Sequence, residues 1–324
     1  MASPRDRAGA FNYLAPSVRS SLYRNGEVLV HRDPDGNDSG AKGLDLVEHA
    51  MTVTDARALP ERPTCERNGF ELIRCPLARP DLDFFDHEAV ARHYYPEVAE
   101  VVADAVGASY VVAFDHNVRS AQAKASKARL QGGQDVQAPI HLTHGDYTLR
   151  SAPERLEQLA KPPSGNDTLR SILPPGRSVL DPEPVQRAVA GDLRFAIINL
   201  WRSIAPEPIA THPLALCDAR SVAPRDLVVF EVHYQDRIGE NYFAKHADHH
   251  GWHYFPAMTR DEGLLLKQWD SAGTLARSRG ARGDGDDPEG AGTFSLHSAF
   301  DDPTTPPDAP DRRSIEVRCA VLYA

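Results

Sequence analysis

The stretch "HLTHGDYTLR", residues 141–150, contains a histidine and an aspartate two positions apart, His144-Gly145-Asp146. On a β-strand, residues i and i+2 point to the same side, so such a pair can present two ligands to one metal ion. An oxygen-activating non-haem iron site uses two imidazoles and one carboxylate and keeps its other positions open. The same pattern recurs at His31-Arg32-Asp33 and His246-Ala247-Asp248, so the surrounding sequence must distinguish the three pairs.

The composition is that of an ordinary globular protein, with 324 residues, 41% hydrophobic and 25% charged. This length can bury a substantial core. The net charge of −10 and the lack of a basic stripe argue against a nucleic-acid partner. No apolar run is long enough to span a membrane. We therefore expect a small-molecule partner, and the sequence leaves the oligomeric state open.

The cysteines indicate a reducing compartment. There are four of them, and none forms a C-x-x-C pair that would indicate a zinc ribbon or a redox motif. Four scattered thiols in a chain of this length favour a reduced protein over a disulfide scaffold. The first residues, "MASPRDRAGAFNYLAP" (1–16), lack the apolar run of a signal peptide. The sequence thus predicts a cytoplasmic location.

Short apolar runs rich in β-branched and aromatic residues recur through most of the chain, each bounded by Pro, Gly or Asp. This pattern predicts a mainly antiparallel β sandwich or barrel. The predicted strands are 108–116, 138–144, 193–201, 226–234, 251–256, 263–269, 293–297 and 314–323.

Helical segments flank this β region. Residues 86–106 have apolar positions at helical spacing, and we expect one broken helix or two short ones, with Asp86 as a cap and Pro96 opening the second segment. We predict a single domain over 1–324. Residues 1–107 would buttress a core at 108–324, which has insertions at 149–192 and 272–292. The first insertion has a helical pattern at 152–160 beside a Pro-rich loop, and the second contains an acidic stretch at 277–292 that we expect to be mobile.

The His-x-Asp motif alone is weak, because about one copy is expected by chance in a chain of this composition. His31-Arg32-Asp33 opens a turn and lacks the other motifs of a kinase. His246-Ala247-Asp248 lies in a histidine-dense segment, but too few strands separate it from His297, and a polar loop is the favoured interpretation. His144-Gly145-Asp146 ends an alternating apolar run, and at least five predicted strands separate it from His297. A capping role would suit the isolated motif, but this context favours a metal site.

The C-terminal strand places Arg312, Ser314, Glu316 and Arg318 on one face. An inward arginine with a hydroxyl two residues away can hold a carboxylate through charge-assisted hydrogen bonds, such as the distal carboxylate of 2-oxoglutarate. Arg312 could equally be a solvated edge charge. Arg318, bracketed by apolar residues, could pair with an internal acid such as Glu316 or with a ligand.

Several stretches together resemble a known family, the CmcJ/asaB-like hydroxylase/desaturase group of Fe(II)/2-oxoglutarate dioxygenases. They occur in order over nearly the whole chain: "FNYL" (11–14), "FDHNVR" (114–119), "HGDYT" (144–148), "INLWRS" (198–203), "PLALCDARSV" (213–222), "HGWHYFPAMTRDEGLLLKQWDS" (250–271), "HSAFDDP" (297–303) and "RRSIEVR" (312–318). The chain departs from the family pattern at Asn117, where a threonine is usual, and at Ser203, where a proline is usual. Both changes could adjust the substrate pocket, and neither removes a ligand.

The resemblance implies a double-stranded β-helix, or jelly-roll, enzyme that oxidises a C–H bond of a small molecule with Fe(II), 2-oxoglutarate and O₂. The outcome would be hydroxylation, desaturation or cyclisation in natural-product or amino-acid-derived metabolism. It also implies that His144, Asp146 and His297 are the iron ligands, and that Arg312 with Ser314 anchors 2-oxoglutarate.

Three further side chains are candidates for substrate contact. Arg202 follows an apolar strand and could reach into the barrel, although a structural salt bridge would suit it equally, and Arg119 allows the same two interpretations. Tyr147 could line a pocket or belong to the core. Two other functions stay open: a cupin-like metalloenzyme without 2-oxoglutarate, which would not need Arg312, and a non-catalytic β-sandwich that binds a small molecule.

Overall fold

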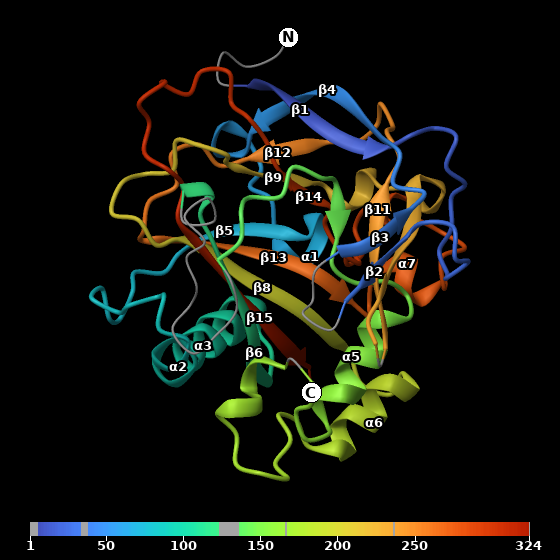
Figure 1. The fold of residues 1–324 in the computed structure, drawn as a ribbon, viewed down its shortest axis with the longest axis vertical. Coiled ribbons are helices and arrows are strands. Elements are labelled where there is room, and N and C mark those ends of the chain that lie inside the picture. The colour runs from blue at the N-terminus through green and yellow to red at the C-terminus, as the bar shows by residue number, and fades with distance from the viewer. Residues whose placement is uncertain (1–5, 34–37, 123–135, 166, 236, 324) are drawn as a thin grey trace.

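Two β-sheets form the core of the computed structural model, which describes residues 6–33, 38–122, 136–165, 167–235 and 237–323 (Figure 1). The larger sheet has ten strands, and two of its neighbouring pairs, β12 with β4 and β10 with β2, are parallel. In spatial order it contains β1 (Arg7–Leu14), β4 (Leu46–Asp55), β12 (Trp252–Tyr254), β9 (Leu214–Cys217), β14 (His297–Ala299), β7 (His144–Gly145), β11 (Ile238–Ala244), β10 (Leu227–His233), β2 (Leu29–Arg32) and β3 (Asp38–Lys42).

The smaller sheet has five strands, and every neighbouring pair is antiparallel. Its order is β5 (Phe70–Arg74), β13 (Glu262–Asp270), β8 (Phe195–Ser203), β15 (Ser314–Leu322) and β6 (Tyr110–Arg119). All nine residues of β8 are buried, as expected of a strand covered on both faces. The two sheets form the jelly-roll architecture that the sequence predicts.

Six of the eight predicted apolar runs form strands over at least half of their length, but the runs at 138–144 and 293–297 overlap a strand only at their last residue, His144 and His297. β7 covers only His144–Gly145, and β14 begins at His297. The segment before His144 instead makes scattered hydrogen bonds to β1, β11 and β14. Thr143 N–H donates to the Asn12 carbonyl at 3.0 Å, Ala244 N–H donates to the Thr143 carbonyl at 3.3 Å, and Ala299 N–H donates to the Ile140 carbonyl at 2.8 Å. These separate contacts replace a continuous ladder.

A helical layer covers the outer face of the smaller sheet. It consists of α2 (His87–Ala89), the π-helical turn η2 (Val90–Tyr94) and α3 (Tyr95–Val106), and it packs on β6, β15 and β8. The predicted cap is confirmed, because the Asp86 carboxylate accepts a hydrogen bond from Ala89 N–H at 3.0 Å. Pro96 lies in the first turn of α3, also as predicted.

The insertion at 149–192 contains more helix than the sequence indicated. Helix α5 (Ser151–Leu159) matches the predicted segment, but α6 (Pro182–Ala190) and η3 (Thr168–Ser171) occupy what was expected to be a Pro-rich loop. The prolines of α6 lie in its first turn, where the missing N–H groups cost no helical hydrogen bond. Both helices lie at the lower edge of the molecule in Figure 1.

The expectation of a mobile acidic loop at 277–292 is not supported, because a buried carboxylate anchors the loop. Asp284 is 4% exposed and accepts hydrogen bonds from Leu275 N–H at 3.0 Å, Thr293 N–H at 2.6 Å and the Thr293 hydroxyl at 2.7 Å. The remaining helical segments are η1 (Ala56–Ala58), α1 (Cys65–Asn68), η4 (Ala219–Ser221), η5 (Pro224–Asp226), α7 (Thr274–Arg277) and η6 (Asp284–Asp286). None of the described helices has the length and apolar character needed to cross a membrane.

Candidate metal centre and cosubstrate site

The fold brings His144, Asp146 and His297 together. β7 and β14 are neighbours in the centre of the larger sheet, and His297 pairs with His144 across them. Asp146 Oδ1 lies 3.7 Å from His144 Nε2 and 4.0 Å from His297 Nε2. All three ligand atoms lie within 4.8 Å of one another. Two imidazoles and a carboxylate on one side of a cavity form the donor set that non-haem iron prefers.

Backbone contacts orient both imidazoles. His144 Nδ1 lies 2.7 Å from the Leu142 carbonyl, and His297 Nδ1 lies 3.4 Å from the Ser295 carbonyl. An Nδ1–H that donates to a carbonyl leaves Nε2 with a free lone pair for a metal. Burial and the adjacent His297 ring lower the pKa of His144 to about 4, and burial also lowers the pKa of His297. Both rings are therefore neutral at physiological pH, the form that binds a cation.

Arg318 holds the other oxygen of the carboxylate. Its Nε and Nη2 donate to Asp146 Oδ2 at 3.3 and 3.2 Å, and its Nη1 donates to Asp115 at 2.7 Å. The Asn117 amide oxygen, oriented toward the guanidinium, accepts at 2.9 and 3.0 Å. Burial alone would raise the pKa of Asp146, but Arg318 and the two imidazoles outweigh it and hold that pKa well below its usual range. Oδ1 thus faces the imidazoles while Oδ2 is fixed.

Arg312 lies in the same cavity as the three ligand side chains, together with Arg119 and Trp201. It is 3% exposed, its guanidinium lies 5.5 Å from the Trp201 ring centre, and Nη1 donates to the His212 carbonyl. Its Nε has no partner, and no carboxylate of the described residues forms an ion pair with it. Burial and the nearby Arg119 guanidinium lower the pKa of Arg312. A buried cation without a counter-charge is suited to binding an anion.

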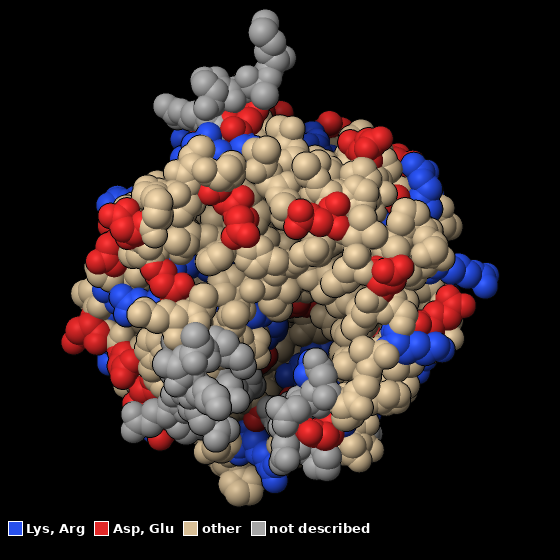
Figure 2. All heavy atoms as spheres, turned by 45° about the horizontal axis from the view of Figure 1, so that its top comes forward, with Lys and Arg blue, Asp and Glu red and all other residues tan. Residues whose placement is uncertain are grey.

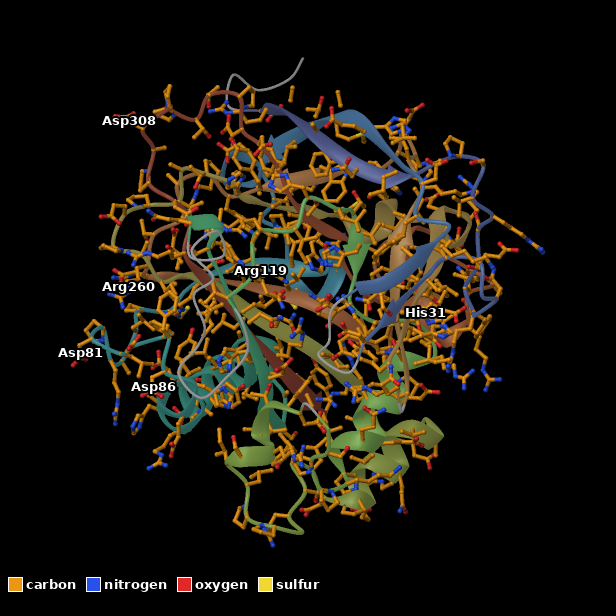
Figure 3. All side chains as sticks on the ribbon, viewed as in Figure 1. His31, Asp81, Asp86, Arg119, Arg260 and Asp308 are labelled. Atoms are coloured by element: carbon orange, nitrogen blue, oxygen red, sulfur yellow. The ribbon has the colours of Figure 1, made fainter. Side chains whose placement is uncertain are left out.

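The strand predicted to carry the anion site presents the expected side chains to this region. Ser314 of β15 pairs with Arg119 of β6 and Ser203 of β8, and paired residues share a face of the sheet. The Ser314 hydroxyl is buried and has no hydrogen-bond partner. Glu316, two residues on, lines the cavity and accepts from the Asn199 amide at 2.5 Å. Arg119 donates to Gln137 and to the Ala138 carbonyl, and Figure 3 labels it near the middle of the molecule.

The structure does not bring Arg202 to the cavity, so the expected substrate contact is wrong for this residue. Arg202 pairs with Ile315, which places it on the opposite face of the sheet from Ser314 and Glu316. It is fully buried, donates to the Cys75 carbonyl at 2.6 Å and lies 5.6 Å from the Tyr94 ring centre.

The suggestion that Arg318 binds 2-oxoglutarate is likewise not supported, because the N–H groups of Arg318 already donate to Asp146, Asp115 and Asn117.

A second, larger cavity of about 290 Å³ lies beside Asp146 and contains Tyr147 and Arg318 in its lining. Charged side chains of both signs line it, among them Asp115 and Arg155. Figure 2 shows a hollow in one face of the molecule, with acidic and basic atoms visible inside it. Burial raises the pKa of Tyr147 to about 12, so its phenol is neutral and can donate a hydrogen bond to a bound molecule.

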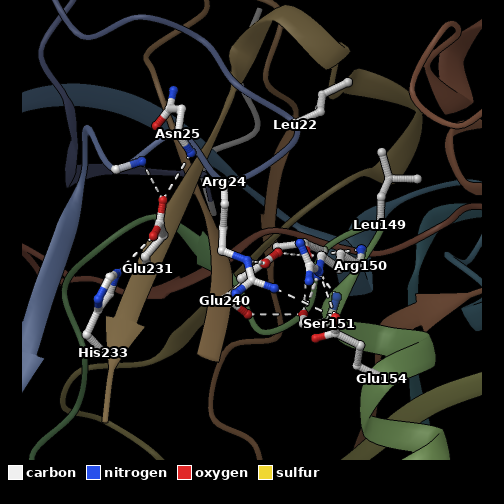
Figure 4. Close-up of polar contacts among 12 residues, drawn as sticks. Leu22, Arg24, Asn25, Leu149, Arg150, Ser151, Glu154, Glu231, His233 and Glu240 are labelled. Carbon is white, nitrogen blue, oxygen red and sulfur yellow. Dashed lines mark hydrogen bonds and ion pairs between the residues drawn. The ribbon is translucent and has the colours of Figure 1, made fainter. Parts of the chain in front are cut away.

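A polar network holds the turn that follows the His-x-Asp pair (Figure 4). Glu240 of β11 accepts from the Thr148 hydroxyl at 2.7 Å and forms an ion pair with Arg24, while its backbone carbonyl accepts from the Ser151 hydroxyl at 3.1 Å. Arg24 also lies 3.7 Å from Glu154 of α5. The network fixes the chain between Asp146 and α5, and so the wall of the larger cavity.

The other two His-x-Asp pairs lie elsewhere. His31 is exposed on β2, toward the right of Figure 3, and stacks edge-on with His233. In the third pair, His246 Nε2 lies 3.7 Å from Asp248, whose side chain is fully exposed. Neither pair is near His297. The sequence did not single out Asp115 and Asn117 as partners of Arg318, although both lie in the quoted stretch "FDHNVR" at alternate positions that face the interior.

Comparison with known proteins places the chain in a family. A family model described as "Oxidoreductase/YMDC permease-like domain" matches residues 11–173 and 177–322. The chain belongs to this family. One relative, "Uncharacterized protein in dcmA 3'region" of Methylophilus leisingeri, is 43% identical over 60% of this chain and 88% of its own length.

Named relatives of this oxidoreductase are oxygenases. The "Alpha-ketoglutarate-dependent dioxygenase phiK" of Fungal sp. (strain ATCC 74256) is 29% identical over 96% of this chain and 94% of its own length. The solved "iron and alpha-ketoglutarate-dependent endoperoxidase NvfI" superposes with a TM-score of 0.72 at 23% identity, covering 99% of this chain and all of that chain. The first match confirms the predicted resemblance to 2-oxoglutarate dioxygenases, and the second confirms the predicted fold.

Proposed function

We propose that this protein is an Fe(II)- and 2-oxoglutarate-dependent oxygenase that acts on a C–H bond of a small molecule. One observation carries the proposal: His144, Asp146 and His297 face a cavity that also contains Arg312, a buried guanidinium without a carboxylate partner among the described residues. The first three supply a metal donor set, and the fourth supplies charge for an anionic cosubstrate. A relative that depends on the same cosubstrate aligns along 96% of the chain.

The metal role is assigned to the atoms that are free to coordinate. His144 and His297 would bind Fe(II) through Nε2, since each Nδ1 faces a backbone carbonyl. Asp146 would bind through Oδ1, since Arg318 occupies Oδ2. With 2-oxoglutarate and O₂, Fe(II) supplies the oxidising chemistry that removes hydrogen from an unactivated C–H bond, and the protein positions the reactants.

We assign the distal carboxylate of 2-oxoglutarate to Arg312 and Ser314. Both have a buried polar atom without a partner, and a carboxylate that accepts from the guanidinium and the hydroxyl would satisfy both atoms. The Trp201 ring lies against the Arg312 guanidinium and shields it from water, which would strengthen an ion pair between Arg312 and the bound carboxylate.

For the substrate we propose the larger cavity beside Asp146, with Tyr147 in contact, and Arg119, which lines the smaller cavity together with His144, Asp146 and His297, as a further anchor. The charged lining suits a polar small molecule, for example from natural-product or amino-acid-derived metabolism. Whether hydroxylation, desaturation or cyclisation follows depends on which substrate atoms this lining holds nearest to the metal ligands.

Anaerobic titration tests the proposal. Fe(II) with 2-oxoglutarate should give a weak visible charge-transfer band in the wild-type protein, which His144→Ala abolishes and His246→Ala leaves intact. Iron binding without the band would instead favour a cupin-like enzyme, and no iron binding would favour a non-catalytic binding protein. Screening small acids and amino acids for substrate-dependent succinate release would then identify the substrate class.

The anchor assignment has its own test, with a matched neighbour as control. Arg312→Ala should raise the 2-oxoglutarate concentration needed for half-maximal band intensity by roughly 100-fold, the effect of about 2–3 kcal/mol expected for a charge-assisted pair, while the Kd for Fe(II) stays unchanged. Arg313→Ala, which removes an exposed guanidinium next in sequence, should have no effect. Equal behaviour of the two variants would contradict the assignment.

A further inference from the structure

A second group of metal-binding side chains lies apart from the site described above. It consists of Asp226, His249 and His250, whose ligand atoms lie within 4.8 Å of one another. Asp226 ends η5 directly before β10, and the two histidines lie in the loop between β11 and β12. None of the three lines the cavity of His144, Asp146 and His297.

The two imidazoles converge on one carboxylate oxygen. His249 Nε2 lies 2.8 Å and His250 Nε2 lies 3.4 Å from Asp226 Oδ2, which also accepts from Ala223 N–H at 2.8 Å. The His250 side chain has no exposed surface, yet its Nε2 makes no hydrogen bond. A buried ring nitrogen that faces a carboxylate without a hydrogen bond is costly, and a cation between the two would relieve this cost.

The separation of His250 from Asp226 and the outer contacts of His250 suit a tetrahedral ion. Zinc bonds of about 2.0–2.1 Å at tetrahedral angles separate ligand atoms by about 3.4 Å, the separation of His250 Nε2 and Asp226 Oδ2. His250 Nδ1 lies 3.2 Å from the Tyr13 hydroxyl, which Trp252 Nε1 also contacts at 2.8 Å. When Nδ1–H donates to this hydroxyl, Nε2 presents a lone pair, the arrangement typical of a metal-bound histidine.

From this geometry we propose that Asp226, His249 and His250 bind a second divalent cation of the zinc type. Two imidazoles and a carboxylate suit zinc. The His249 side chain is 43% exposed, so its Nε2 can move from 2.8 Å to about 3.4 Å from Asp226 Oδ2, the separation of two zinc ligands, and water can reach the fourth position. The ion would join the start of β10 to the loop before β12. This site does not depend on the proposed oxygenase function.

The first experiment removes the other metal centre. Metal-free His144→Ala/His297→Ala protein is dialysed against buffered Zn(II), and bound zinc is measured per chain by emission spectrometry. We expect one zinc per chain. Adding His249→Gln, a half-exposed position where folding is not at stake, should lower occupancy at the same free zinc at least tenfold, whereas adding His93→Gln on η2 should not. No stoichiometric zinc, or equal binding in both triple variants, would overturn the proposal.

A second measurement guards against misfolding of the double variant. The protein with both centres intact should bind two zinc ions per chain, and His249→Gln alone should bind one. Zinc should also raise the Tm of the His144→Ala/His297→Ala protein but not that of its His249→Gln derivative. A wild-type stoichiometry of one that His249→Gln leaves at one would reject the second site while leaving the centre at His144 intact.

Discussion

Arg318 orients Asp146, the proposed carboxylate ligand, more directly than any other described side chain does. It holds Asp146 Oδ2 with two nitrogens while Asp115 and Asn117 fix the guanidinium itself. The carboxylate therefore keeps one oxygen turned toward both imidazoles. Such outer contacts orient metal ligands, and their loss typically weakens metal binding 10–100-fold.

We therefore expect Arg318→Lys to raise the Kd for Fe(II) by roughly 10–100-fold, because a lysine keeps the charge but cannot form the same planar fork. Anaerobic equilibrium dialysis would measure it. The contrast with Arg312→Ala, expected to keep iron and lose 2-oxoglutarate, separates the two arginines. If Arg318→Lys weakened only 2-oxoglutarate binding, the roles assigned to the two arginines would be reversed.

The buried imidazole of His116 should make the free energy of unfolding depend on pH. It is 2% exposed on β6 and its Nδ1 lies 2.8 Å from the Tyr95 hydroxyl of α3, while burial lowers its pKa to about 4. An unfolded histidine titrates near 6.5, so between these values the unfolded chain binds a proton that the folded chain does not. Acidification from about pH 6.5 to 4 should thus lower the free energy of unfolding.

The expected slope from this one group approaches about 1.4 kcal/mol per pH unit within that window. Denaturant unfolding at several pH values would measure it for the wild type and for His116→Gln, whose amide can still accept from Tyr95 but does not titrate. The variant should show a shallower loss of stability on acidification. Parallel profiles in the two proteins would rule out His116 as the cause.

Among the elements, the acidic loop at 277–292 is held in place by one buried carboxylate and not by apolar side chains packed in a core. Residues 277–292 are rich in glycine and charge, a composition that predicts mobility. Asp284 nevertheless satisfies three donors from α7 and the segment before β14, so the loop is held at its middle. Because β14 begins at His297, this anchor also positions the strand that carries the third proposed metal ligand.

Asp284→Ala should therefore leave three donors without partners and lower the free energy of unfolding by about 2–4 kcal/mol. Arg277, Arg279 and Arg282 are already exposed, and release of the loop at its middle should let trypsin bind it in an extended conformation, so cleavage at these residues should be faster than in the wild type. Asp287→Ala, at an exposed position in the same loop, is the control and should change neither quantity. Rapid wild-type cleavage in this loop would show that the anchor is ineffective.

For the whole molecule, the sequence predicted the architecture of the sheets more accurately than the face of the sheet to which individual side chains point. Strand periodicity and the family resemblance led to a jelly-roll with His144 and His297 on separate strands. The predicted substrate contact of Arg202 was wrong because a shift of one residue along β8 turns a side chain to the other face of the sheet, and the sequence does not fix that register. The partners of Arg318 were missed because Asp115 and Asp146 are distant in sequence and meet only after the sheets pack.

The same packing makes the proposed metal centre a link between the two sheets. His144 and His297 belong to the larger sheet, and Asp146 is tied through Arg318 to β15 of the smaller sheet. Binding of Fe(II) to the folded state alone should stabilise it by about 2.7 kcal/mol at a hundred times the Kd, which corresponds to a rise in Tm of roughly 5 °C. Anaerobic thermal unfolding of the metal-free protein with and without added Fe(II) would measure it. His297→Ala should lose the rise and His246→Ala should keep it, whereas a rise that survives His297→Ala would mean that the ion binds elsewhere.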